Sequence, residues 1–210
     1  MEAALRGAQA VFESVQATLG AHRDALDDRI VENMLAGYAY VDEVVAGDVD
    51  VLALGNLKHL LELNTLVLCG TSEPRRQAHA GHLAATERRF YEEREAGVQD
   101  VVEWYELHAD DSPWLRAVGL YIRMLSAPQL FIEGNHRTGA LVMSWVLLRD
   151  GLPPFVLTAE NAADYFRASA LARQVPKHGL WASIRAIRLR RHGAALLRQG
   201  AYPRFLAPAA

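Results

Sequence analysis

The sequence predicts an all-α fold. Over most of the chain, apolar residues recur three and four positions apart, as they do on one face of an amphipathic helix. We find no internal repeat and no run of alternating apolar and polar residues long enough to predict a strand. With 51% hydrophobic and 22% charged residues, the 210-residue chain has the composition of a globular protein that can bury a sizeable core without disulfides or structural metals.

The helices are placed by apolar spacing and by residues that begin or end helices. Residues 2–46 carry apolar positions at helical spacing and predict N-terminal helices. Asp48 or Asp50 is suited to cap a helix that runs through Leu68 and ends near Gly70. Further helices are predicted after the break at Pro74 through Glu95, then at 98–108 and at 114–125.

The segment from Asn135 to Arg149 is the most apolar of the predicted helices. A helix that is apolar on nearly every side belongs in the interior, so we expect it in the middle of the domain. Gly151 is suited to end this helix, and Pro153 with Pro154 prevents its continuation.

The length fits one domain. We predict a single domain over 1–210, with a core at about 50–160, N-terminal helices at 2–46 and a basic helical C-terminal extension at 161–210. The single cysteine, Cys69, cannot form an intrachain disulfide, and this favours a cytoplasmic location. The first residues do not resemble a signal peptide, and no apolar stretch is long enough to predict a membrane span.

The charges are unevenly distributed, although the net charge is only −3. No acidic residue follows Asp164, whereas nine basic residues do: Arg167, Arg173, Lys177, Arg185, Arg188, Arg190, Arg191, Arg198 and Arg204. This basic tail is either a solvated helix face that docks on an acidic neighbour or a contact surface for an anionic partner. Few aromatic residues lie among these charges, so we do not expect a nucleic acid.

A short glycine-containing loop with the sequence FIEGNHR leads into the central helix. Backbone N–H groups at the helix start, its positive dipole end and Arg137 together predict an anion site. Glu133 is placed to hold a divalent cation that bridges phosphates. The alternative is that Gly134 and Asn135 form only a turn, Arg137 pairs with Glu133, and Phe131 belongs to the core.

Residues 131–138, FIEGNHRT, resemble the signature of the Fic/Doc (Fido) family, HxFx(D/E)(G/A)N(G/K)RxxR. The flanking sequences WLRAVGLYIRMLSAPQLF and LVMSWVLLRDGLPPF are similar to the helices on either side of that signature. The resemblance covers about 114–158. It implies an all-α, Fic-like (Fido) helical bundle whose central helix is preceded by a phosphate-binding loop.

The resemblance also implies roles for individual residues. Phe131 would pack under the loop, and Glu133 would bind Mg²⁺ on the phosphates of ATP or another nucleotide. The nucleotide would be held by the loop and the first helical turn, at Gly134, Asn135, His136, Arg137 and Thr138.

Three positions depart from the family signature. Gln129 stands where the family has its catalytic histidine, Leu130 where it has proline, and Ala140 where it has a second arginine. Glutamine stays neutral and cannot accept a proton as a base, and loss of a general base costs roughly 10² to 10⁴ in rate. His136, inside the loop, is a hydrogen-bond donor to phosphate, a displaced base, or a residue without a role. The candidate catalytic positions are therefore His136 and Gln129.

Three functions follow from these observations. The first is transfer of AMP or another phosphate-containing group from a nucleotide to a hydroxyl of a protein target, at an atypical site. The second is a catalytically inactive nucleotide-binding or phosphate-binding module that regulates a protein partner. The third is a helical interaction protein that uses the basic tail. No membrane partner is expected, and a homo-oligomer is left open.

Overall fold

The computed structural model describes residues 1–19, 25–177 and 180–206, and these residues form helices joined by loops and turns. No β-strand lies among them, so the predicted all-α class is confirmed. The elements are α1 (Glu2–Leu19), α2 (Asp28–Ala46), α3 (Lys58–Cys69), α4 (Glu73–Ala78), α5 (Ala80–Glu92), α6 (Val98–Leu107), α7 (Pro113–Leu125), α8 (Asn135–Arg149), α9 (Ala162–Arg173), α10 (Leu180–Gln199) and the 3₁₀-helix η1 (Pro203–Phe205).

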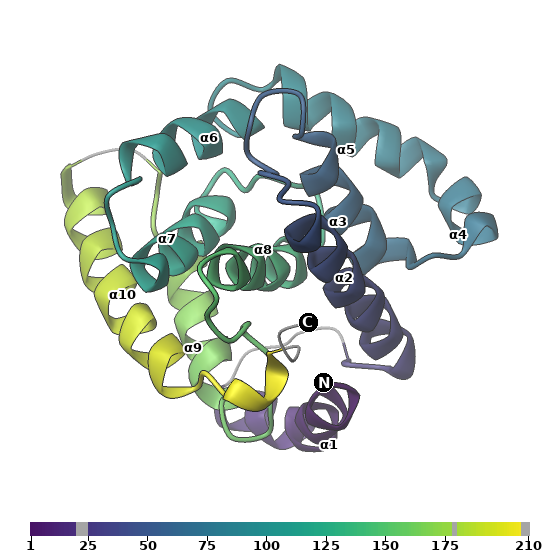
Figure 1. Ribbon diagram of the computed structural model, residues 1–210, viewed down its shortest axis with the longest axis vertical. Helices are drawn as coiled ribbons and strands as arrows, with labels where there is room; N and C mark the ends of the chain where they lie inside the picture. The colour runs from purple at the N-terminus through teal and green to yellow at the C-terminus, as the bar shows by residue number, and fades with distance from the viewer. Residues whose placement is uncertain (20–24, 178–179, 207–210) are drawn as a thin grey trace.

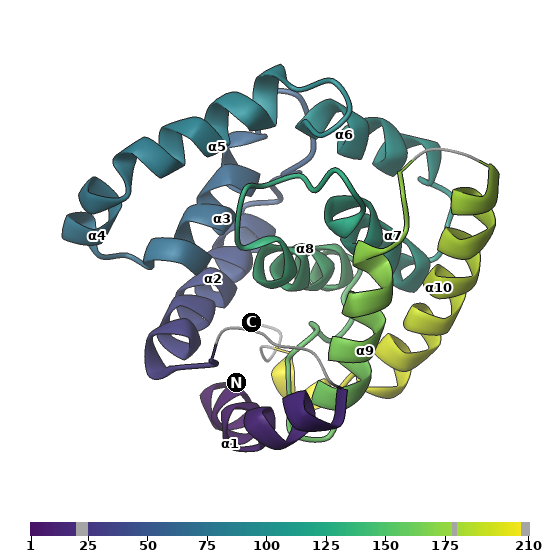
Figure 2. The same cartoon turned by 180° about the vertical axis from the view of Figure 1, so that it is seen from behind.

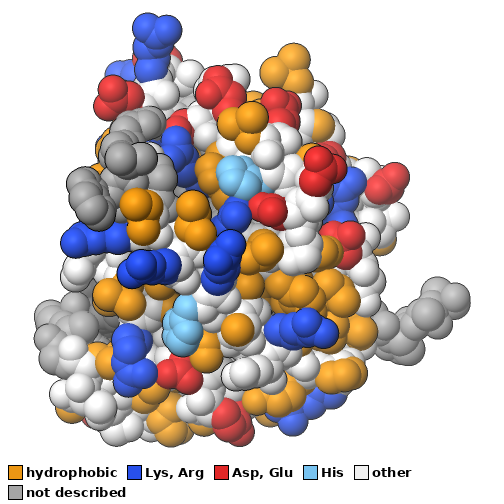
Figure 3. Space-filling model, turned by 90° about the vertical axis from the view of Figure 1, so that its left-hand side faces the viewer, with side chains coloured by type: hydrophobic (Ala, Val, Ile, Leu, Met, Phe, Trp, Pro, Cys, Tyr) orange, Lys and Arg blue, Asp and Glu red, His pale blue; other side chains and the backbone are white. Residues whose placement is uncertain are grey.

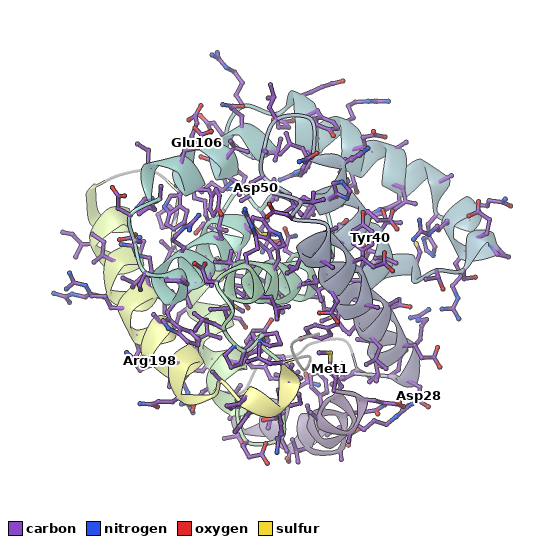
Figure 4. All side chains as sticks on the ribbon, in the orientation of Figure 1. Met1, Asp28, Tyr40, Asp50, Glu106 and Arg198 are labelled. Carbon is purple, nitrogen blue, oxygen red and sulfur yellow. The ribbon has the colours of Figure 1, made fainter. Side chains whose placement is uncertain are left out.

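Helix α8 lies at the centre of the molecule, with the other helices arranged around it (Figures 1 and 2). Eleven of its fifteen residues are buried, as expected for a helix that is apolar on nearly every side. Helices α7, α2 and α3 pack directly on it, and side chains fill the spaces between the ribbons (Figure 4). The predicted central position of this helix is therefore confirmed.

Both ends of α8 lie where local signals place them. The helix begins at Asn135 and ends at Arg149, as the sequence predicts. Gly134 before it and Gly151 after it both have a left-handed backbone, with φ of 77° and 67°. L-residues with a Cβ avoid this region, so glycine is the residue suited to both positions.

The predicted start of the second helical region at Asp48 or Asp50 is wrong. Helix α3 begins only at Lys58, and residues 48–57 form turns. The Asp50 carboxylate accepts a hydrogen bond from the backbone N–H of Leu52 at 3.0 Å. An aspartate that bonds the N–H two residues ahead stabilises a turn and competes with a helical cap.

The polar helix predicted between Pro74 and Glu95 is divided in two. Helices α4 and α5 are separated at His79, and α5 ends at Glu92. Helix α4 is a short element with no buried side chain. Helix α4 is instead bonded to α3, because Arg76 pairs with Glu62 at 2.6 Å and donates to the Gly70 carbonyl at 3.2 Å.

The predicted region 2–46 contains α1 and α2, and the predicted region 161–210 contains α9, α10 and η1; 20–24, 178–179 and 207–210 lie outside the described residues. Helix α1 packs against α2 and α9, and α10 packs against α7 and α9. Figure 3 shows the face on which α10 lies, with Lys and Arg side chains gathered across its middle. Along the described part of the chain, no helix combines the length and apolarity that a membrane span requires.

Candidate functional site

The loop between α7 and α8 is anchored to the core by Phe131. This side chain is 1% exposed. Its ring stacks on that of Phe90 in α5, with centroids 5.7 Å apart and an interplanar angle of 6°. Offset-stacked rings combine apolar burial with a defined orientation. Phe131 therefore lies under the loop and fixes its position relative to α5.

Asn135 closes the loop on itself. Its side-chain oxygen accepts a hydrogen bond from the Phe131 N–H at 2.8 Å, and its amide group donates to the Phe131 carbonyl at 2.8 Å. The same amide group donates to the side-chain oxygen of Gln129 at 3.3 Å. Asn135 is 4% exposed, so its side chain shapes the loop and its backbone N–H belongs to the first turn of α8.

Helix α3 holds the junction between the loop and α8. The side-chain amide of Asn64 donates to the Glu133 carbonyl at 2.9 Å and to the Thr138 hydroxyl at 3.1 Å. A Cβ added to Gly134 would lie 2.9 Å from that amide nitrogen. Thr138 is fully buried, and its N–H donates to the Gly134 carbonyl at 2.9 Å. The hydrogen bonds described for Thr138 are thus made to Asn64 and Gly134, and the predicted contact of Thr138 with a nucleotide stays a prediction.

The first turn of α8 opens into a cavity of about 340 Å³. Gly134, Asn135, His136 and Arg137 line one end of it. The first N–H groups of a helix have no partner inside the helix, and the helix dipole places positive charge at this end. Both features favour an anion, and the binding of a phosphate at this turn stays a prediction.

Apolar side chains from α1, α2 and α9 form most of the other walls of this cavity, among them Phe12, Met34 and Phe166. The Phe12 and Phe166 rings meet edge to face, with centroids 5.4 Å apart. None of the described residues that line the cavity is an aspartate or a glutamate. The described lining therefore suits a ligand with an anionic group at one end and an apolar or flat group at the other.

His136 lies in the first turn of α8 and is held by two tyrosines. The Tyr121 hydroxyl lies 3.2 Å from Nδ1 of the His136 ring, and the Tyr165 hydroxyl donates to the His136 carbonyl at 3.0 Å. Tyr121 belongs to α7 and Tyr165 to α9. Both the ring and the backbone of His136 are thus oriented by helices far away in the sequence.

Arg137 lines the same cavity, and one of its Nη atoms donates to the Val67 carbonyl of α3 at 2.7 Å. Within the described residues no ion pair joins Arg137 to Glu133. The Glu133 side chain is exposed next to the loop. The pairing weighed as an alternative to the anion site is therefore not formed between these two residues.

Gln129 lies at the start of the loop and is partly buried. Its side-chain nitrogen donates to the Leu125 carbonyl at 3.2 Å, and its side-chain oxygen accepts from Asn135. Its backbone carbonyl accepts from Arg89 of α5 at 2.7 Å. Both ends of the amide are used within the protein, so this side chain ties the loop to the end of α7.

Several residues near the site could not be predicted from the sequence. Asn64, Tyr121, Tyr165 and Arg173 come from α3, α7 and α9 and meet the loop or the cavity only in the fold. None of them belongs to a short motif with the loop, so their spacing along the chain does not predict that they lie near it. In the sequence, Arg173 is only one of the charges of the basic tail.

The sequence was compared with known proteins. No protein-family model matches the chain. Protein adenylyltransferase fic-1 of Caenorhabditis elegans is 25% identical to it over 127 residues, which are 56% of this chain and 24% of that protein. The chain is thus similar in sequence to a Fic protein over about half of its length. It spans about a quarter of the length of this relative, and its loop keeps the phenylalanine, acid, glycine, asparagine and arginine of the Fic signature.

Solved Fic structures also align with this Fic-like domain. Two structures of Fic-1 from C. elegans align with TM-scores of 0.49 and 0.48, at 17% and 18% identity, and cover 93% and 91% of this chain and 60% and 55% of theirs. A Fic domain-containing signalling protein from Bacteroides thetaiotaomicron aligns with a TM-score of 0.45 at 14% identity, covering 90% of this chain and 80% of its own. Each alignment covers more of the Fic-like domain than of the solved protein.

Proposed function

We propose that this Fic-like domain binds ATP or another nucleotide through its phosphates and transfers AMP or another phosphate-containing group to a hydroxyl of a protein target. The observation that carries this proposal is the cavity at the first turn of α8, lined by His136 and Arg137 and by no described carboxylate. A phosphate there would meet helix N–H groups, the helix dipole and a guanidinium group. The adenylyltransferase name of the C. elegans relative supports the same chemistry.

For AMP transfer, the target hydroxyl oxygen attacks the α-phosphorus of ATP and forms a new P–O bond. The bond from that phosphorus to the pyrophosphate oxygen breaks, pyrophosphate leaves, and the hydroxyl loses its proton. Phosphoryl transfer depends mostly on positioning and on charge stabilisation, which Arg137 and the first turn of α8 would supply. His136, oriented by Tyr121, would donate a hydrogen bond to phosphate or accept the hydroxyl proton.

Glu133 would be the ligand of a magnesium ion that is shared with the nucleotide. Among the described residues no group of three or more histidine, cysteine or acidic side chains is placed to hold a metal. Mg²⁺ in nucleotide sites is usually bound by one or two carboxylates together with substrate phosphates and water. The exposed Glu133 carboxylate beside the loop supplies one such ligand. Bound there, Mg²⁺ would neutralise part of the phosphate charge.

A non-catalytic nucleotide-binding module that acts on a protein partner is the second candidate. The observation that favours it is Gln129, which cannot accept a proton and whose amide is bonded at both ends to the protein. Such a module would keep the anion site at α8 and bind the nucleotide without turnover. Binding and turnover must therefore be measured separately.

The first test is titration of the protein with ATP, with and without Mg²⁺, by calorimetry and thermal shift. Wild type is compared with Arg137→Ala and with Arg88→Ala, whose exposed side chain in α5 lies away from the cavity lining. At 100 times its dissociation constant, ATP should raise the free energy of unfolding by about 2.7 kcal/mol. We expect Mg²⁺-dependent binding that is lost in Arg137→Ala and retained in Arg88→Ala.

The outcomes separate the two candidates. Binding together with release of pyrophosphate and labelling of a protein by α-labelled ATP supports transfer. Binding without turnover of any nucleotide donor supports the regulatory module. Unchanged affinity in Arg137→Ala, or no binding across a panel of nucleotides, would refute the assignment of the α8 site.

A further inference from the structure

A second arginine reaches the cavity from another helix. Arg173, in the last turn of α9, lines the same cavity as His136 and Arg137. Its side chain is exposed, and within the described residues it forms no ion pair. Arg167 of the same helix instead pairs with Asp164 at 3.1 Å. Arg173 is therefore a cation at the cavity whose charge no described carboxylate neutralises.

On the α8 side of the cavity, one position holds only a small, uncharged side chain. Ala140, one helical turn beyond Arg137, also lines the cavity and is 4% exposed. Its side chain is a single methyl group and contributes no charge and no hydrogen-bond donor. Helix α8 thus places one guanidinium group in the cavity, at Arg137, although it has a second position that faces the same space.

We propose that Arg173 supplies, from α9, the second guanidinium contact to the phosphates of the nucleotide. The inference rests on the proposed function, because it concerns the ligand of that same site. Arginine matches phosphate geometry with two parallel N–H donors, and two such groups suit a ligand with several phosphates better than one. Because Arg173 is exposed, we assign it to the distal phosphates, and Arg137 with the first turn of α8 to the phosphate nearest the helix.

This assignment predicts which ligands bind more weakly when Arg173 is removed. ATP has distal phosphates, and AMP has none. Removing one partner of a charged hydrogen bond weakens binding by about tenfold or more. Arg173→Ala should therefore weaken ATP binding by about tenfold or more and leave AMP binding within about threefold of wild type.

The experiment is calorimetric titration of wild type, Arg173→Ala and Arg167→Ala with ATP and with AMP, in the presence of Mg²⁺. Arg167 is the matched control because it lies on the same helix, is exposed, and does not line the cavity. Melting temperatures of the three unliganded proteins should agree, since both side chains are exposed. We expect selective loss of ATP affinity in Arg173→Ala alone.

The results distinguish this inference from the proposed function beneath it. If wild type binds ATP, Arg137→Ala loses it and Arg173→Ala keeps it, the inference is wrong and the α8 site stands. Equal losses of ATP and AMP affinity in Arg173→Ala would overturn the assignment to the distal phosphates. If wild type binds neither ATP, AMP nor any other nucleotide of the panel, both the inference and the proposed function are refuted.

Discussion

Among the single residues, His136 and its contact with Tyr121 carry the chemistry that we propose for the site. If the tyrosine hydroxyl donates to Nδ1, the neutral ring carries its proton on Nε2 and acts as a donor. If Nδ1 donates to the hydroxyl, Nε2 keeps a lone pair and can act as a base. In either arrangement Tyr121 determines where the second ring nitrogen points.

We expect Tyr121→Phe to weaken ATP binding, because the ring of His136 loses the hydroxyl that orients it. Removal of one hydrogen bond should also lower the free energy of unfolding by about 1 kcal/mol. Tyr165→Phe is the matched control: it removes a hydroxyl that bonds the His136 backbone carbonyl instead of the ring. The two variants should lose similar stability in urea unfolding, but Tyr121→Phe should lose more ATP affinity. Equal affinities would contradict the orienting role.

At the scale of elements, α3 positions the N-terminus of α8. Asn64 is 1% exposed and bonds both sides of the loop–helix junction, and the Val67 carbonyl accepts from Arg137 at 2.7 Å. Gly134 makes the close approach of these two helices possible, because it has a positive φ and no Cβ. The proposed anion site therefore depends on the contact between α3 and α8 as much as on the loop sequence.

Gly134→Ala should destabilise the protein more than Gly151→Ala. Both glycines have a left-handed backbone, which costs an L-residue about 1–2 kcal/mol. A Cβ at Gly151 would meet open space, whereas one at Gly134 would lie 2.9 Å from the Asn64 amide nitrogen and 3.1 Å from a Val67 methyl carbon. Urea unfolding of the two variants measures the difference. Equal losses of stability would show that the contact with α3 adds nothing.

At the scale of the whole molecule, a buried charge cluster ties the chain after α9 to α6 and α7. Asp100 of α6 pairs with Arg123 of α7 and, at 3.0 Å, with Lys177, whose side chain is fully buried. Arg123 also donates to the Lys177 carbonyl at 2.8 Å. Burial lowers the pKa of Lys177, and its hydrogen bond to Asp100 opposes that shift. This cluster helps to hold the end of α9, and with it Arg173, in place.

We expect Asp100→Asn to lower the free energy of unfolding by about 3–5 kcal/mol, because it leaves the buried Lys177 and the partly buried Arg123 without their carboxylate. Asp164→Asn is the control, since it breaks the exposed pair with Arg167, for which the expected loss is about 0–1 kcal/mol. Thermal and urea unfolding of both variants test this difference. A loss in Asp100→Asn no larger than that in the control would mean that the cluster does not stabilise the fold.

Local signals in the sequence were enough to predict the helical class, the bounds of α8 and the loop that precedes it. Helical spacing, the glycines at 134 and 151 and the signature residues are local signals, because each acts within a few positions of the chain. The same local reading misplaced the start of α3, where the Asp50 carboxylate bonds the backbone of a turn.

The residues around the loop and the cavity are brought there by the packing of distant helices. Asn64, Tyr121 and Tyr165 bond the loop or the first turn of α8, and Arg173 lines the cavity; they come from three other helices. The structure also shows that the Gln129 side chain links the loop to the end of α7, because it bonds both Leu125 and Asn135. Such contacts join residues far apart in the sequence, and they arise only when the burial of apolar faces brings the helices around α8 together. A local pattern cannot report them, because their partners are selected by packing and not by spacing along the chain.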